Sequence, residues 1–269
     1  MRTVDGAGLK KGVHVAQIPE YPAVAGDPNP QRLAWGALPK RLFVAFSAFD
    51  ALFVLAYFAL VAAHTSSESL FQILNLDKEA TLPSWYSGMQ YFVVAIGYLV
   101  LGSRLVPDRR RVRVLRPLWL ALGIGFTLLS ADEVGAAHER MGRALRRFDL
   151  FDAHIFNVKG LDQWMVLYAL IGICLMLVFS RQILRAWREW RFEVLLFCLG
   201  FTVLACGAFV TEMAQIMLRL EGKLFLLEVG IEEWLEMFGV TILILPAYRI
   251  LSYAMISEPD TEDSAISEG

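Results

Sequence analysis

Residues 164–180 read WMVLYALIGICLMLVFS and contain no charged side chain. An α-helix needs about 20 mainly apolar residues to cross the hydrocarbon core of a bilayer. Together with its flanks, this stretch predicts a transmembrane helix over residues 163–184. The composition agrees, because 57% of the chain is hydrophobic, whereas soluble domains contain roughly 45–50% apolar residues.

Five further apolar stretches of similar length flank this helix in the sequence. They predict helices over residues 42–63, 86–105, 117–137, 193–214 and 229–250. A bilayer admits helices whose backbone groups are all hydrogen-bonded within the segment. We therefore expect an all-α fold, a polytopic membrane helix bundle with about six transmembrane helices.

The two ends of the chain differ from this hydrophobic middle. Residues 1–38 contain many glycines and prolines without periodicity, which predicts a flexible cytoplasmic tail. Residues 256–269 are polar and acidic, which predicts a disordered tail. The six-helix transmembrane domain is then expected to occupy residues 39–255.

Lys and Arg residues are distributed unequally between the two sides of the predicted bundle. Of the 25 in the chain, 17 fall on the side of the tails and of the second and fourth loops, and 8 on the other side. Basic residues favour the cytoplasmic side, so both termini are expected there. The basic loop over residues 109–116 adjoins the membrane, which favours contact with the lipid bilayer and argues against a nucleic-acid partner.

Carboxylates follow or precede three of the apolar runs at one common depth. Asp132 and Glu133 lie at the end of the third predicted helix, Glu212 lies at the end of the fifth, and Glu236 lies at the start of the sixth. An ionisable group in the membrane costs roughly 2.5–3.5 kcal/mol at the helix centre and usually marks a function. In the predicted topology, all of these carboxylates lie near the outer leaflet.

The helical spacing of these residues predicts a shared site. Asp132 and Glu139 are seven residues apart and would lie on one face of a continuous helix. Carboxylates on facing helices build di-iron and di-manganese sites, and a set of Asp, Glu and His ligands suits Fe, Mn or Zn. We therefore expect a divalent metal with ligands drawn from Asp132, His138, Glu139, Glu212, Glu233 and Glu236. Glu133 or Glu139 is the expected catalytic general base.

Other roles remain open for the carboxylates at the helix ends and for Asp50. The carboxylates nearest the helix ends have Arg and Lys neighbours, with which they could form ordinary interfacial ion pairs. Asp50 lies alone in the middle of the first predicted helix. It is expected either to carry a proton or to hydrogen-bond to a neighbouring helix.

Two short motifs in the chain resemble those of a known group of proteins. The stretch Leu129-Ser130-Ala131-Asp132-Glu133 followed by His138-Glu139, with Glu232-Glu233 and Glu236 later in the chain, resembles a family of uncharacterised multi-pass bacterial membrane proteins. The resemblance implies a location in the cell inner membrane and no particular activity. Membrane hydrolases of the ceramidase and adiponectin-receptor type use three histidines and seven helices, and this chain lacks their His-x-x-x-His pair.

Three functions are compatible with these patterns. The first is a metal-dependent membrane hydrolase or oxidase that acts on a lipid or another hydrophobic substrate. The second is a proton- or cation-coupled transporter or channel, which would need polar groups along the whole path. The third is a non-catalytic membrane subunit. The inner part of the sixth helix is apolar over residues 242–246, which disfavours transport by a monomer.

Overall fold

A computed structural model of the chain describes residues 30–63, 73–76, 81–137, 140, 141, 144 and 163–256. The described part is helical. Its elements are α1 (Pro30–Ala62), α3 (Leu82–Gly102), α4 (Arg110–Arg113), α5 (Arg116–Gly135), α7 (Gln163–Val178), α8 (Ser180–Glu189), α9 (Arg191–Ala205), the π-helical η2 (Cys206–Thr211), α10 (Glu212–Leu218) and α11 (Lys223–Ile256).

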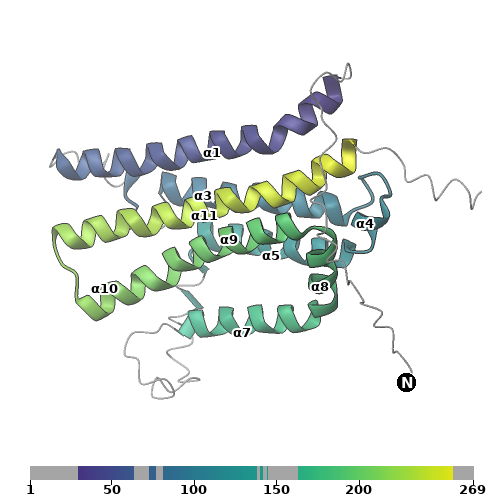
Figure 1. Cartoon of the computed structure of the whole chain (residues 1–269). Coiled ribbons are helices and arrows are strands. Elements are labelled where there is room, and N and C mark those ends of the chain that lie inside the picture. The colour runs from purple at the N-terminus through teal and green to yellow at the C-terminus, as the bar shows by residue number, and fades with distance from the viewer. Residues whose placement is uncertain are drawn as a thin grey trace, which may run out of the picture.

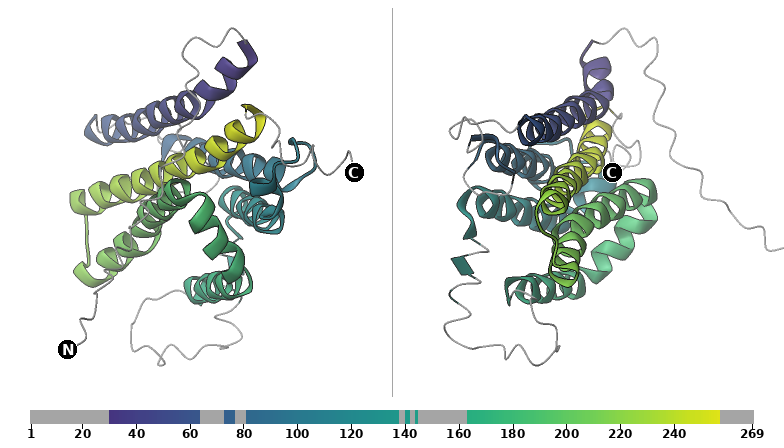
Figure 2. Two further views of the ribbon diagram at one scale, coloured as in Figure 1. Left: turned by 45° about the vertical axis from the view of Figure 1, so that its right-hand side comes forward. Right: turned by 90° about the vertical axis from the view of Figure 1, so that its left-hand side faces the viewer.

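Helix α11 is the centre of the bundle. It packs against α1 on one side, α9 on another and α3 on a third, and α3 packs in turn against α5. These long helices run side by side in Figures 1 and 2. Helix α7 lies apart from α11, and α8 connects α7 to α9. We call the end of the bundle where α5 stops and α11 starts the carboxylate end. The opposite end, with the turn from α3 into α5, is the arginine end.

The apolar core explains why α11 is central. Met237, Leu243 and Ile244 of α11 are fully buried. On α3, the Tyr98 ring stacks on Trp119 and Phe126 of α5, with ring centroids 5.8 and 6.0 Å apart. Stacked aromatic pairs add specific geometry to the burial of large apolar surfaces, so they fix how α3 and α5 lie against each other.

Among the residues that the structure describes, four helices are long and apolar enough to cross a membrane, and a fifth candidate is the bent pair of α7 and α8. The chain is therefore a helical protein with the character of a membrane protein. Helix α3 has the length of a span but is not among these candidates, and it carries the buried polar residues Ser84, Ser87 and Gln90. The predicted count of six includes α3 and goes beyond the four or five that length and apolarity support.

The fourth predicted helix is shorter than expected. It ends at Val178, and the following α8 is bent away from it by 71°. Residues 181–189 alternate arginines with apolar side chains, so one face of α8 is charged and the other is apolar. Such a helix favours the membrane surface over its interior. The helix predicted over residues 163–184 is therefore interrupted after residue 178.

Three helix boundaries also differ from the predicted ones. Helix α1 begins at Pro30, inside the stretch expected to be a tail, while residues 1–29 and 257–269 lie outside the described part of the chain. Helix α11 begins at Lys223 and continues through Pro246 to Ile256. Pro246 therefore does not mark the end of that helix.

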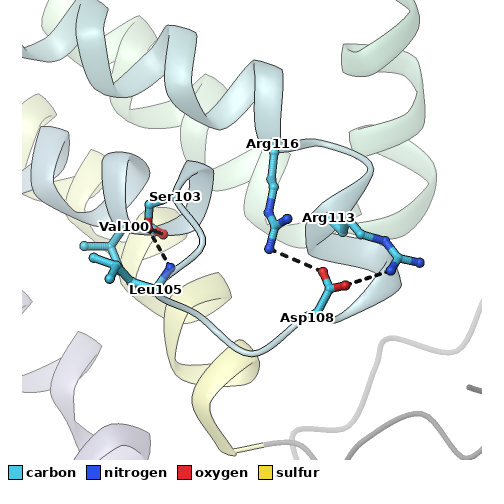
Figure 3. A network of polar contacts seen from close by, with 6 residues as sticks. All are labelled: Val100, Ser103, Leu105, Asp108, Arg113 and Arg116. Atoms are coloured by element: carbon cyan, nitrogen blue, oxygen red, sulfur yellow. Dashed lines mark hydrogen bonds and ion pairs between the residues drawn. The ribbon is translucent and has the colours of Figure 1, made fainter. Parts of the chain in front are cut away.

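The turn from α3 into α5 is held by polar contacts at the arginine end. The Asp108 carboxylate accepts a hydrogen bond of 2.7 Å from Arg113 and forms an ion pair with Arg116 at 3.3 Å (Figure 3). The Ser103 hydroxyl donates to the Val100 carbonyl at 2.7 Å and closes the end of α3. This short connection keeps α3 and α5 antiparallel and in a fixed register.

Candidate functional site

Carboxylates of two helices converge on one tyrosine at the carboxylate end. The ring of Tyr91 on α3 is buried, with 6% of its surface exposed. Its phenol interacts electrostatically with Asp132 and Glu133 of α5 and with Glu233 and Glu236 of α11. We call these four acidic residues the carboxylate cluster. The prediction that acidic groups from the third and sixth helices share one depth and one side of the bundle agrees with this arrangement.

Close backbone packing places α5 beside α3 at this level. A Cβ atom added to Gly88 would meet the Val134 side chain, and it would lie 3.3 Å from the Ser130 carbonyl oxygen. The Ser130 hydroxyl donates to the Gly88 carbonyl at 2.7 Å. Small residues let membrane helices approach this closely, and hydroxyls hydrogen-bond across them. The contact therefore sets the position of Glu133 relative to Tyr91.

A π-helical stretch brings a third helix against the cluster. A Cβ atom added to Gly207 of η2 would lie 2.7 Å from Cγ of Glu236 and 3.0 Å from the Glu232 carbonyl oxygen. The backbone of η2 therefore lies directly on this turn of α11. Within η2, the Thr211 hydroxyl donates to the Gly207 carbonyl. π-Helical turns inside α-helices occur frequently at functional sites.

Helix α7 contributes a second phenol. The Tyr168 hydroxyl donates a hydrogen bond of 2.8 Å to Oδ2 of Asp132. Asp132 is 8% exposed, whereas Glu133, Glu233 and Glu236 are half-buried. The cluster therefore combines one buried, hydrogen-bonded carboxylate with three that reach the edge of the bundle.

The structure places the predicted metal ligands unequally. Asp132, Glu233 and Glu236 lie around Tyr91. Glu212 is the first residue of α10, but its side chain is not described, and His138 and Glu139 lie outside the described residues. Within the described part of the chain, no group of three or more His, Cys, Asp or Glu side chains is close enough to hold a metal ion.

The end of α5 bears on one geometric expectation, the shared face of Asp132 and Glu139. Helix α5 ends at Gly135, and Ala136 adopts a left-handed conformation with φ of 49°. A left-handed residue interrupts the helix, as at many helix C-termini. The helix that carries Asp132 therefore ends at Gly135, and Glu139 lies outside the described residues.

A second polar group lies deeper in the bundle, around Asp50. The Asp50 side chain is fully buried. Its Oδ1 atom lies 2.7 Å from the Tyr86 hydroxyl and 2.8 Å from Nε2 of Gln90. Its Oδ2 atom accepts from the Thr241 hydroxyl at 2.8 Å. Asp50 thus joins α1 to α3 and α11, as one of its two sequence-based interpretations expected.

The Asp50 group as a whole was not recognisable from the sequence. Gln90 and Thr241 are uncharged and lie 40 and 191 positions from Asp50. The available signal was that Gln90 and Ser87 are polar residues within an otherwise apolar stretch. Because Gln90 and Tyr91 are adjacent, the Asp50 group adjoins the carboxylate cluster along α3.

An apolar layer separates these polar groups from the arginine end. Val94 and Ala95 of α3 and Leu243, Ile244 and Ala247 of α11 are all fully buried. Thr241 and Arg249 are eight residues apart, or about 12 Å along a helix. Beyond the layer, Nε of Arg249 lies 3.3 Å from Oε1 of the buried Glu193. The polar groups near the carboxylate end are therefore closed off from the arginine end.

Comparison with known proteins adds a family and no activity. No curated protein and no solved structure is found to match the chain. A family model described as a domain of unknown function, DUF8692, matches residues 45–250. The match includes the Asp50 group and the whole carboxylate cluster, and extends from α1 into α11. The chain therefore belongs to the DUF8692 family.

Proposed function

We propose that this protein is a membrane enzyme that acts on a lipid or another hydrophobic substrate near the outer leaflet. The observation that carries the proposal is that Asp132 and Glu133 of α5 and Glu233 and Glu236 of α11 all act electrostatically on the buried Tyr91 phenol. Keeping four carboxylates together in a helix bundle is costly, which points to a functional use.

Access from the bilayer supports a hydrophobic substrate. Val134 and Trp234 adjoin Glu133 and Glu233 in the sequence and are 47% and 40% exposed. In a membrane, such side chains contact acyl chains. A substrate dissolved in the bilayer would reach the half-buried carboxylates from the side, without passing through water.

The roles follow from burial. Glu133 is half-buried and would act as the general base, a role that contributes typically 10²- to 10⁴-fold to a rate. Asp132, Glu233 and Glu236 would help bind a divalent Fe, Mn or Zn ion, with His138, Glu139 and Glu212 as further ligands from the same end. A metal bound there would lower the pKa of a water molecule and supply a nucleophile. These three carboxylates are not gathered closely enough to hold a metal without such further ligands.

Proton- or cation-coupled transport is the second candidate, and the Asp50 group favours it. This group extends the polar region from the carboxylate cluster toward the middle of the bundle. Transport also requires a path to the other side. Fully buried Val94, Leu243 and Ile244 occupy the next turns, so the closed apolar layer favours a site that is accessible from one side.

A lipid-turnover assay on the purified protein tests the proposal. The wild type is reconstituted into nanodiscs made from a bacterial lipid extract, and its products are followed by mass spectrometry and its metal content by elemental analysis. Glu133→Gln and Glu236→Gln are the test variants. Glu189→Gln is the matched control, because Glu189 pairs with Arg111 at the arginine end at 3.6 Å.

The expected result is conversion of one lipid class by wild type and the Glu189→Gln control. We expect one equivalent of metal in both proteins, at least a 100-fold slower reaction in Glu133→Gln and loss of metal in Glu236→Gln. A wild type that is free of metal and leaves every lipid unchanged would contradict the proposal. Proton flux into proteoliposomes that is abolished by the same two variants would instead establish transport.

A further inference from the structure

The Tyr86 hydroxyl has more acceptors than it has hydrogens. Its oxygen lies 2.7 Å from Oδ1 of Asp50 and 3.0 Å from the backbone carbonyl oxygen of Phe46. A phenol carries a single O–H hydrogen, and a carbonyl cannot donate. One phenol hydrogen could serve both acceptors only as a shared, bifurcated bond, whereas a proton on Asp50 gives each of the two contacts a hydrogen of its own. From this geometry we propose that Asp50 is a proton-binding site, a neutral carboxylic acid that donates to Tyr86 while Tyr86 donates to Phe46.

The other partners of Asp50 fit the neutral acid. Thr241 donates to Oδ2, which is then the carbonyl oxygen of the acid, and Gln90 donates to Oδ1 through Nε2. Nε2 of Gln90 also lies 2.8 Å from the Thr241 hydroxyl oxygen. The group then contains four hydrogens: the acid proton, the phenol hydrogen, the Thr241 hydroxyl hydrogen and the Gln90 amide hydrogen directed at Asp50. Each of these hydrogens has its own acceptor.

The described partners of Asp50 carry no positive charge that would stabilise an ionised carboxylate. Among the described residues, no ion pair involves Asp50, and its hydrogen-bond partners Tyr86, Gln90 and Thr241 are all uncharged. A buried charge without a counter-charge is costly and is usually avoided by binding a proton or a cation. Tyr86 is the titratable side chain that contacts Asp50 from the helices packed around it.

Aromatic rings keep this position dry. The Tyr86 ring packs against Phe46, Phe49 and Phe53 of α1, with centroids 6.1, 6.0 and 4.9 Å away. The apolar layer around Val94 and Leu243 closes the other side. The proton of Asp50 is therefore held between two helices, with a tyrosine as its hydrogen-bond acceptor. The site does not depend on the chemistry proposed for the carboxylate cluster.

Infrared spectroscopy of the purified protein tests the proposal directly. A protonated carboxylic acid has a C=O stretching band that a carboxylate lacks. We expect the difference spectrum between wild type and Asp50→Asn at neutral pH to contain this band. Asp132→Asn is the matched control, and it should leave the Asp50 band in place. A difference spectrum that contains only carboxylate bands would overturn the proposal.

Two further measurements keep the test decisive. In Tyr86→Phe, the acid loses its acceptor, so its C=O band should shift to a higher frequency; an unshifted band would overturn the donation to Tyr86. Asp50→Asn imitates a neutral acid, so its melting temperature should stay close to that of wild type. Sodium or potassium ions that raise the melting temperature of wild type but not of Asp50→Asn would show a bound cation in place of the proton.

Discussion

Gly200 of α9 and Gly239 of α11 face each other in direct backbone contact. A Cβ atom added to either residue would lie 2.9 Å from the carbonyl oxygen of the other. Interfaces between membrane helices are rich in small residues, which allow the backbones to approach closely. Such interfaces depend on van der Waals packing, since lipid supplies no hydrophobic driving force between helices. The contact holds α9, and the η2 stretch that follows it, against the part of α11 that carries the carboxylate cluster.

The first prediction concerns this contact. Gly239→Ala would place its methyl group 2.5 Å from the Leu204 backbone nitrogen, and overpacking of this kind costs about 1–3 kcal/mol. We expect a lower melting temperature in detergent. The control is Gly125→Ala, because a Cβ atom at Gly125 would meet nothing within 4 Å. A Gly239→Ala protein as stable as the Gly125→Ala protein would show that the helices do not approach this closely.

The second prediction concerns the attachment of α7. Tyr168→Phe removes the hydrogen bond to Asp132 and leaves the ring in place. Hydrogen bonds between membrane helices average about 0.6 kcal/mol and reach about 1.7, so we expect a loss of about 1 kcal/mol. A double-mutant cycle with Asp132→Asn should show a coupling of that size. Tyr253→Phe is the control. It removes the same hydroxyl and leaves the Tyr253 ring, which packs on Trp190 with ring centroids 5.0 Å apart. Additive single effects would count against the hydrogen bond.

The third prediction compares two ion pairs at the arginine end. Glu193 is 2% exposed and pairs with Arg249, whose guanidinium also lies over the Phe192 ring. Removing one partner of a buried pair costs roughly 3–5 kcal/mol. Because the Arg249 side chain is 28% exposed, we expect about 2 kcal/mol for Glu193→Gln.

The comparison protein is Glu189→Gln, which removes the exposed pair with Arg111. Exposed ion pairs contribute about 0–1 kcal/mol, so its melting temperature should change little. Both variants are measured by thermal unfolding in the same detergent. Equal effects of the two substitutions would mean that Glu193 is solvated and that its pairing with Arg249 is of the ordinary surface kind.

The fourth prediction concerns topology. The six membrane crossings predicted from the sequence, with α3 included, would place both termini in the cytoplasm and the carboxylate end outside. Single cysteines are introduced at Leu105, which is 78% exposed in the turn after α3, and at Leu224, which is 61% exposed near the start of α11. An impermeant thiol reagent added to intact cells should label the cysteine at 224 and spare the one at 105. The reverse pattern would invert the orientation, and equal labelling would contradict an odd number of crossings by α5, α7 and α9, which lie between the two positions.

Much of the helical architecture follows from the sequence alone. The apolar runs predicted the centres of all six long helices, because a membrane leaves a buried backbone few alternatives to the helix. Their boundaries were predicted less well. The end of α5 at Gly135 and the break after Val178 depend on single residues, Ala136 and Phe179, whose backbone conformations the hydropathy pattern does not reveal.

The sequence also determined that acidic groups collect at one end of the bundle. Charged residues interrupt apolar runs at recognisable positions, and the alternation of helix direction then places Asp132, Glu133, Glu233 and Glu236 at one depth. Tertiary structure alone decided that these residues surround Tyr91 and that Asp50 meets Tyr86, Gln90 and Thr241. Rotation of each helix about its axis and the contacts between distant helices depend on packing at positions such as Gly88, Gly207 and Gly239, and no local pattern in the sequence encodes which surfaces will meet.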